Sequence, residues 1–145
     1  MPSSFLPRMK PTAAGRDGFY LDADYYQAGL APEGMKPDAR YAYPVSLNHA
    51  VVKLAPWAEK AHAKHRALDE AARLNRIAPL AAHLLRNKLD VLYVVFGSEA
   101  GVLVSYPGAG RFAEKPEYDP TKRRWYRLAA GHRSEAPLWT DPHVD

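Results

Sequence analysis

The stretch VLYVVFGSEAGVLVSYPG, residues 91–108, decides the fold. It contains two runs of β-branched and aromatic residues, 91–96 and 102–106, and these residue types are enriched in strands. A five-residue loop with glycine at both ends, Gly97 to Gly101, joins the runs, and a Pro-Gly pair follows the second one. Two such runs joined by a short loop that contains glycine predict an antiparallel hairpin.

Upstream of the hairpin the apolar residues change their period. Between residues 46 and 88 they recur at steps of three and four, which is the spacing of an amphipathic helix. Ser46 suits an N-cap, and Pro56 and Pro79 should interrupt or start a helix because proline lacks a backbone donor. We therefore predict helices packed against the sheet, near residues 46–55, 57–76 and 79–87.

Residues 1–44 form a Pro/Gly-rich arm, in which six prolines and four glycines block long helices and central strands. The arm also carries many aromatic side chains, too many for a free linker, so we expect it to pack on the domain that spans residues 45–145. Before about residue 18 we expect disorder. The aromatic residues are Phe19, Tyr20, Tyr25, Tyr26, Tyr41 and Tyr43.

Downstream of the hairpin, Asp119 followed by Pro120 is typical of a helix start, with the aspartate as N-cap and the proline at the first position. We predict a short helix that ends at Gly131, with Trp125, Leu128 and Ala129 facing inward. Residues 138–140 should begin another strand. Together these elements predict an α+β domain with an antiparallel sheet.

The charge of the chain is concentrated in one segment. The 145 residues include 20 Lys and Arg and 16 Asp and Glu, for a net charge of +4. Residues 111–133 alone hold seven basic and three acidic residues, so the rest of the chain is balanced. This distribution argues against a chain that coats nucleic acid or an anionic membrane along its length. It indicates one local feature that attracts anions.

Several classes of function lack support in the sequence. The chain has no cysteine, which excludes thiol chemistry, and no Gly-Lys-Ser/Thr phosphate loop. No apolar run approaches the roughly 20 residues of a transmembrane helix, and the N-terminus lacks the apolar core of a signal peptide. Ser98 and Ser105 lack the glycine elbow that exposes a nucleophile. We therefore expect neither an enzyme nor a bound cofactor.

Three histidines at predicted helical positions are candidate metal ligands. Two of them are three residues apart on one predicted helix face, but no carboxylate lies in metal-binding register with them. We interpret them as exposed helix histidines and expect no metal. They are His62, His65 and His83.

The stretch 118–126 concentrates residues that suit a zwitterion. Arginine clamps a carboxylate in two parallel hydrogen bonds, Trp and Tyr provide flat walls and hydroxyls, and an aspartate further along can neutralise an ammonium. These features are typical of a site for a free amino acid. A purely structural interpretation stays open, in which Trp125 and Leu128 belong to the core and Arg123 pairs with Asp119 or Glu117.

Here the sequence resembles a known family, the double-Cache sensor domains, which are PAS-like extracytoplasmic modules of bacterial chemoreceptors and sensor kinases. The resemblance covers roughly residues 43–145 and rests on the Pro-Val-Ser-Leu-Asn string, the hairpin and a Tyr-x4-Arg-x-Trp-Tyr signature. The signature residues are Tyr118, Arg123, Trp125 and Tyr126. The Arg-Arg-Trp-Tyr string is also similar to the Cache region of calcium-channel auxiliary subunits.

The resemblance implies a role for each matching position. Arg123 and Trp125 would hold the ligand carboxylate, Tyr126 would share that contact, and Tyr118 would support the wall. Asp145 would take the ligand ammonium. His143 stands where the family has a tyrosine. The chain ends before the family's remaining strands and second acidic residue, so we expect an incomplete, membrane-distal module.

The resemblance thus implies a periplasmic or extracellular sensor that binds a small amino acid, amine or carboxylate as the input module of a signal-transduction receptor. It implies no nucleic acid and no membrane contact of this chain, and it allows a homodimer. Two alternatives stay open: a non-catalytic protein-interaction scaffold, as in the channel subunits, and a binder of nucleic acid or anionic surfaces, which the three acids in the basic segment disfavour.

Overall fold

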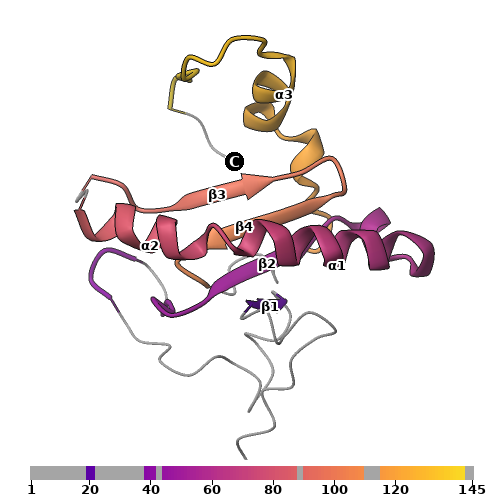
Figure 1. Ribbon diagram of the computed structural model, residues 1–145, viewed down its shortest axis with the longest axis horizontal. Helices are drawn as coiled ribbons and strands as arrows, with labels where there is room; N and C mark the ends of the chain where they lie inside the picture. Colours follow the sequence, from indigo (N-terminus) through magenta and orange to yellow (C-terminus); the bar gives the residue numbers. More distant parts are fainter. Residues whose placement is uncertain (1–18, 22–37, 42–43, 88–89, 110–114, 143–145) are drawn as a thin grey trace, which may run out of the picture.

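A computed structural model describes residues 19–21, 38–41, 44–87, 90–109 and 115–142 of the chain. Its framework is a four-stranded sheet in the order β1-β2-β4-β3, with β1 Phe19–Leu21, β2 Ala50–Leu54, β3 Val94–Gly97 and β4 Val102–Tyr106. Strands β2, β4 and β3 pair antiparallel, and β1 adds to β2 in parallel. Helices α1 (Ala61–Asn75) and α2 (Ala78–Asn87) run along the sheet (Figure 1). The α+β class predicted from the sequence is confirmed.

The main core lies between these two helices and one face of the sheet. Side chains alternate between faces along a strand, so Val52, Val102 and Val104 all face the helices. Small residues on the helix side, Ala67 and Ala71, are fully buried and let α1 approach the sheet closely. Because β2 and β4 are buried along almost their whole length, they form the centre of the domain.

The predicted hairpin is confirmed, and its loop shows why glycine is needed. Strands β3 and β4 pair antiparallel from Val94 opposite Tyr106 to Gly97 opposite Leu103. Gly101 has a φ of 78°, in the left-handed region that favours glycine. A Cβ at this position would lie 2.8 Å from Cζ2 of Trp57. The loop therefore requires glycine for both its backbone angle and its packing.

The helix predicted near residues 46–55 is wrong, because residues 50–54 form the central strand β2. The sequence Ala-Val-Val-Lys-Leu contains two consecutive β-branched residues, and β2 lies inside the sheet, with β1 along one edge and β4 along the other. Ser46 is not a helix N-cap. It forms a β-bridge with Gly108, and its hydroxyl accepts hydrogen bonds from the backbone N–H groups of Asn48 and His49.

The other two upstream helices are found, with shifted starts. The helix predicted for 57–76 is divided into a 3₁₀ turn, Pro56–Glu59, and α1, with extended backbone at Lys60 between them. The helix predicted for 79–87 is α2, and Pro79 lies in its first turn. Among the helices of the described ranges, none is long and apolar enough to cross a membrane.

One part of the N-terminal arm joins the sheet. Strand β1 pairs with β2, and the Phe19 side chain is only 1% exposed within the main core. This placement agrees with the expectation that the arm packs on the domain, and β1 lies at the sheet edge, as the high content of proline and glycine allows. The stretch expected to be disordered, before residue 18, lies outside the described residues.

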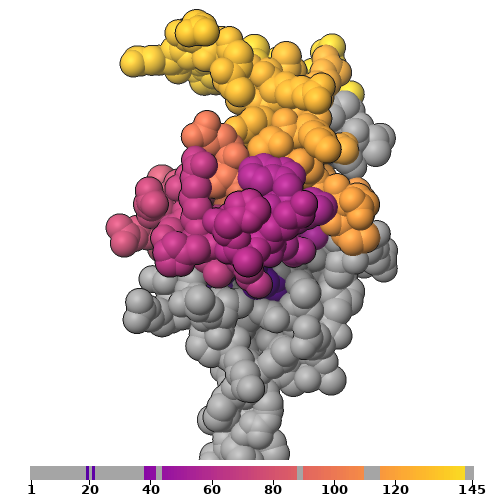
Figure 2. Space-filling model, turned by 90° about the vertical axis from the view of Figure 1, so that its right-hand side faces the viewer, coloured from indigo at the N-terminus to yellow at the C-terminus, as the bar shows by residue number. Residues whose placement is uncertain are grey.

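Beyond the first turn of α3, the C-terminal part stands away from the sheet. A 3₁₀ turn, Pro120–Lys122, leads into α3, Arg124–Gly131, and residues 127–142 are exposed throughout. Figures 1 and 2 show this segment rising above the body of the molecule. Leu128 and Ala129 do not face inward as predicted, and residues 138–140 are not a strand, because no described strand lies beside them to pair with.

Candidate functional site

Four of the predicted site residues gather on the face of the sheet opposite α1 and α2. Leu103 and Val95 point to this face, since their strand neighbours Val104 and Phe96 point to the helices. Tyr118, Trp125, Leu103 and Val95 form a second, smaller apolar cluster. We call the group Tyr118, Arg123, Trp125 and Tyr126 the aromatic–arginine cluster.

Tyr118 is the most buried residue of the aromatic–arginine cluster. It packs on Leu103 and is only 7% exposed. The Arg123 guanidinium lies over its ring, 5.3 Å from the ring centre, in a cation–π arrangement. Tyr118 and Arg123 lie on either side of the 3₁₀ turn Pro120–Lys122, at the two ends of one short loop. The tyrosine ring thereby orients a half-buried arginine.

Trp125 and Tyr126 form the other wall of the aromatic–arginine cluster. Their rings meet edge to face, with centres 6.0 Å apart and an interplanar angle of 81°. Trp125 lies against the end of β3, where a Cβ on Gly97 would come 2.7 Å from its Cη2 atom. Gly97, at the start of the hairpin loop, thus leaves room for the indole, and the hairpin positions Trp125.

Asp119 anchors the loop that carries Tyr118 and Arg123. Its side chain caps the 3₁₀ turn, as predicted, by accepting hydrogen bonds from the Thr121 backbone N–H at 2.9 Å and hydroxyl at 2.6 Å. Its second oxygen accepts a 2.8 Å hydrogen bond from the Trp57 indole. Burial raises the pKa of Asp119, but the hydrogen bonds from Thr121 and Trp57 outweigh it and lower the pKa below the ordinary 3.8.

Asp119→Asn is expected to reduce the free energy of unfolding by about 2 kcal/mol at neutral pH, since it weakens charge-assisted hydrogen bonds at a buried site. The folded-state pKa is lowered, so this stabilisation is complete above pH 3.8 and declines as the pH falls toward the folded-state pKa. Urea unfolding of wild type and variant at several pH values measures it. Glu117→Gln, at an exposed position, is the matched control. Equal stability of wild type and Asp119→Asn at every pH would contradict the anchor role.

Sequence reasoning missed Lys53, which lies on the same face of the sheet. Lys53 stands opposite Leu103 in the antiparallel register, and Leu103 in turn stands opposite Gly97. The Lys53 ammonium donates a 3.5 Å hydrogen bond to the Pro116 carbonyl, at the start of the loop that leads to Tyr118. A lysine within an otherwise apolar strand was the signal that could have revealed it, but the stretch was assigned to a helix.

Arg123 is more buried than the other described basic residues of segment 111–133. Arg123 is half-buried, whereas the remaining basic residues of the segment that the structure describes are exposed: Lys115, Lys122, Arg124, Arg127 and Arg133. Arg123 also immediately precedes α3, whose N-terminal end carries a partial positive charge. The local positive potential expected from the sequence therefore surrounds one partly desolvated guanidinium.

Two predicted site residues, His143 and Asp145, lie outside the described residues. The helix histidines His62, His65 and His83 are exposed, as interpreted from the sequence, and His65 lies 3.3 Å from Asp69 of the next turn. A search of the described ranges for three or more His, Cys, Asp or Glu side chains placed to hold a metal finds none.

Comparison with known proteins adds no family to this description. No model of a known protein family matches the chain. A search of curated proteins finds no match either.

Proposed function

We propose that the aromatic–arginine cluster binds the carboxylate of a small amino acid or of a related amine or carboxylate. The observation that carries this proposal is the half-buried Arg123, which lies over the Tyr118 ring in the same cluster as Trp125, on the sheet face opposite the two long helices. The protein would bind its ligand reversibly and without chemistry. Its resemblance to double-Cache domains favours a role as the input module of a receptor, facing the periplasm or the cell exterior.

The position of Arg123 beside Tyr118 suits carboxylate recognition. The guanidinium carbon lies 5.3 Å from the centre of the Tyr118 ring, and the planar guanidinium carries the N–H groups that form two parallel hydrogen bonds to a carboxylate. Partial burial strengthens such charge-assisted bonds relative to those at an exposed arginine. The contact with Tyr118 also reduces the rotamer entropy lost on binding, because the Arg123 side chain is already held.

The surroundings favour a compact anion with an apolar part. Lys53 adds a second positive charge on the same face, and the α3 N-terminus adds partial positive charge close to Arg123. Trp125 and Tyr126 offer aromatic surface to the rest of the ligand. The ligand ammonium would be neutralised by Asp145, as the resemblance implies.

A thermal-shift screen tests the proposal. The panel is the proteinogenic amino acids, their decarboxylated amines and small organic acids. At about 100 times its dissociation constant, a true ligand should raise the melting temperature by about 5–10 °C. Raising the salt concentration should reduce the effect only modestly, because the site is partly desolvated. If no compound of the panel raises the melting temperature, the proposal is contradicted.

A protein-interaction scaffold is the second candidate, supported by apolar side chains on the C-terminal segment. Trp139 is 89% exposed and Leu138 is 46% exposed, on a stretch that stands away from the sheet. Exposed large apolar residues that lie together are typical of protein contacts. If the protein is a scaffold, no compound of the screen should bind, and substitution of Arg123 should not change the thermal shifts. The same experiment therefore separates the two functions.

A further inference from the structure

A pocket of about 320 Å³ lies at the elbow between α1 and α2, on the helix side of the sheet and therefore on the face opposite to the aromatic–arginine cluster. Its volume is at the lower end of the range for small-molecule sites. Part of the wall is apolar, with Ala50 from β2 and Ala78 and Ala82 from α2. A ligand for this pocket would be small and partly apolar.

The polar part of the wall comes from the end of α1 and from the turn before β2. Among the described lining residues, Arg76 is the one charged group, and it follows directly on α1. Asn75, only 7% exposed, and Asn48 add amide groups beside it. The C-terminal end of α1 carries partial negative charge, but the full charge of Arg76 exceeds it and no described lining residue is a carboxylate, so the net bias favours an anion.

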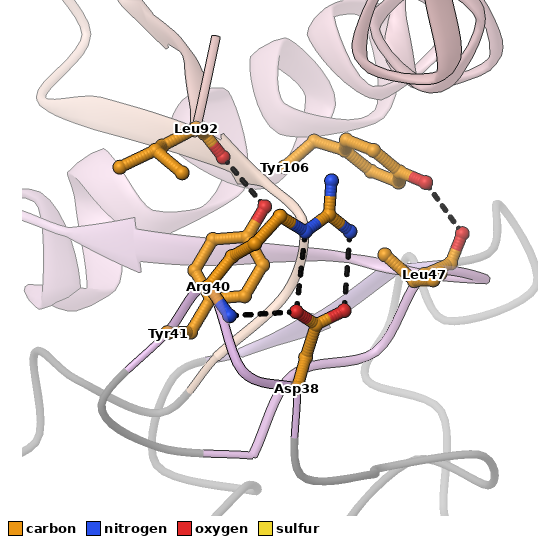
Figure 3. A network of polar contacts seen from close by, with 6 residues as sticks. All are labelled: Asp38, Arg40, Tyr41, Leu47, Leu92 and Tyr106. Carbon is orange, nitrogen blue, oxygen red and sulfur yellow. Dashed lines mark hydrogen bonds and ion pairs between the residues drawn. The ribbon is translucent and has the colours of Figure 1, made fainter. Parts of the chain in front are cut away.

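A hydrogen bond between two lining residues, Tyr106 and Leu47, holds part of the pocket wall in place. The Tyr106 hydroxyl donates a 2.6 Å hydrogen bond to the Leu47 carbonyl, which fixes the turn before β2 (Figure 3). Nearby, the Arg40 side chain donates two hydrogen bonds to the Asp38 carboxylate, both at 3.1 Å, and its backbone N–H donates a third at 2.9 Å. Burial raises the pKa of Tyr106, so its ring stays neutral and does not repel an anion. The pocket wall is thus preorganised.

The N-terminal end of α2 also favours an anion in the pocket. Ala78 and Pro79, the first two residues of this ten-residue helix, both line the pocket. A helix N-terminus carries partial positive charge and free N–H groups, which favours an anion close to Arg76. The Pro79 ring contributes apolar surface without a backbone donor.

We propose that this pocket binds a small organic monoanion, a carboxylate with a short apolar chain, through Arg76. The guanidinium holds the carboxylate, and the alanine wall of α2 accommodates the chain. This second site is separate from the aromatic–arginine cluster, so the two proposals are tested independently of each other.

An NMR titration of the full chain with butyrate tests the pocket, with butyramide and butylamine as neutral and cationic probes. Butyrate should shift the backbone amides of Ala78 and Ala82 saturably, and the other two probes should not. Arg76→Ala should weaken butyrate binding at least tenfold, because it removes the charged donor. Ala82→Leu, which fills the apolar end, should weaken binding as well.

Arg73→Ala is the matched control, since this exposed α1 arginine lies 3.7 Å from Glu70 and does not line the pocket. It should bind butyrate as the wild type does, and so should Arg123→Ala, which alters only the other face. Equal affinity of Arg76→Ala and wild type would overturn the proposal. Equal affinity for butyramide and butyrate would do so too, and so would the lack of saturable shifts at Ala78 and Ala82.

Discussion

Arg123→Ala should weaken the binding of a free amino acid by about 100-fold, while the free energy of unfolding changes by no more than about 1 kcal/mol. The loss in binding reflects two charge-assisted hydrogen bonds to the ligand carboxylate. The small effect on stability is expected because Arg123 is only half-buried and its cation–π contact with Tyr118 is weak at a partly exposed site. Isothermal titration measures the first quantity, and urea unfolding the second.

Two neighbouring changes serve as controls. Arg124→Ala removes the same charge at an exposed position one residue further on, so its affinity should stay within about twofold of the wild type. Arg123→Lys keeps the charge but loses the planar fork, and it should bind about tenfold more weakly than the wild type. If Arg124→Ala weakened binding as much as Arg123→Ala, the effect would be one of general charge, and the specific role of Arg123 would be wrong.

Gly101→Ala should lower the free energy of unfolding by about 2–4 kcal/mol. Its φ of 78° is strained for alanine, and the new Cβ would lie 2.8 Å from Cζ2 of Trp57 and 3.0 Å from the Ala58 Cβ. Trp57 also holds Asp119, so displacing the indole should loosen the loop that carries the site. Urea unfolding measures the effect.

Gly131→Ala provides the comparison for this change. Nothing lies within 4 Å of a Cβ at Gly131, which ends α3, and its φ is not positive. Its free energy of unfolding should equal or slightly exceed that of the wild type. If Gly101→Ala unfolded at the same urea concentration as Gly131→Ala, the packing of Trp57 over the hairpin loop would be incorrect.

The hairpin was predictable because its signals are local. Two apolar runs, a short loop and glycine at both ends lie within residues 91–106, and strands that pair through such a loop need no distant partner. The Asp119 cap was predictable for the same reason, since its hydrogen bonds to Thr121 lie within the turn that it starts. Local chemistry determined both elements.

Strand β2 was missed because its structure depends on distant pairing. Leu47, Val51 and Leu54 fall at helical steps, yet β2 is inserted between β1, about 30 residues earlier, and β4, about 50 residues later. These partners outweigh the local pattern. The same error hid Lys53, which becomes part of the candidate site only when the register with Leu103 is known.

The candidate site was predictable as a set of residue types, but not as a surface. The residue types of segment 118–126 and the resemblance predicted a common role for Tyr118, Arg123 and Trp125, and the structure brings them together beside Leu103. Which face of the sheet they share depends on the strand register, which the sequence leaves open. The inward orientation predicted for Leu128 failed because α3 continues beyond the sheet edge, where it has solvent on most of its surface.

The most direct test of carboxylate binding at the aromatic–arginine cluster follows the indole N–H resonance of Trp125 during a titration. The two titrants are the amino acid that is most stabilising in the thermal-shift screen and its methyl ester, which lacks only the negative charge. The exposed Trp139 serves as the internal reference. We predict a saturable shift at Trp125 with the acid, little with the ester and none at Trp139. Equal shifts with acid and ester, or no shift at Trp125, would contradict carboxylate binding at Arg123.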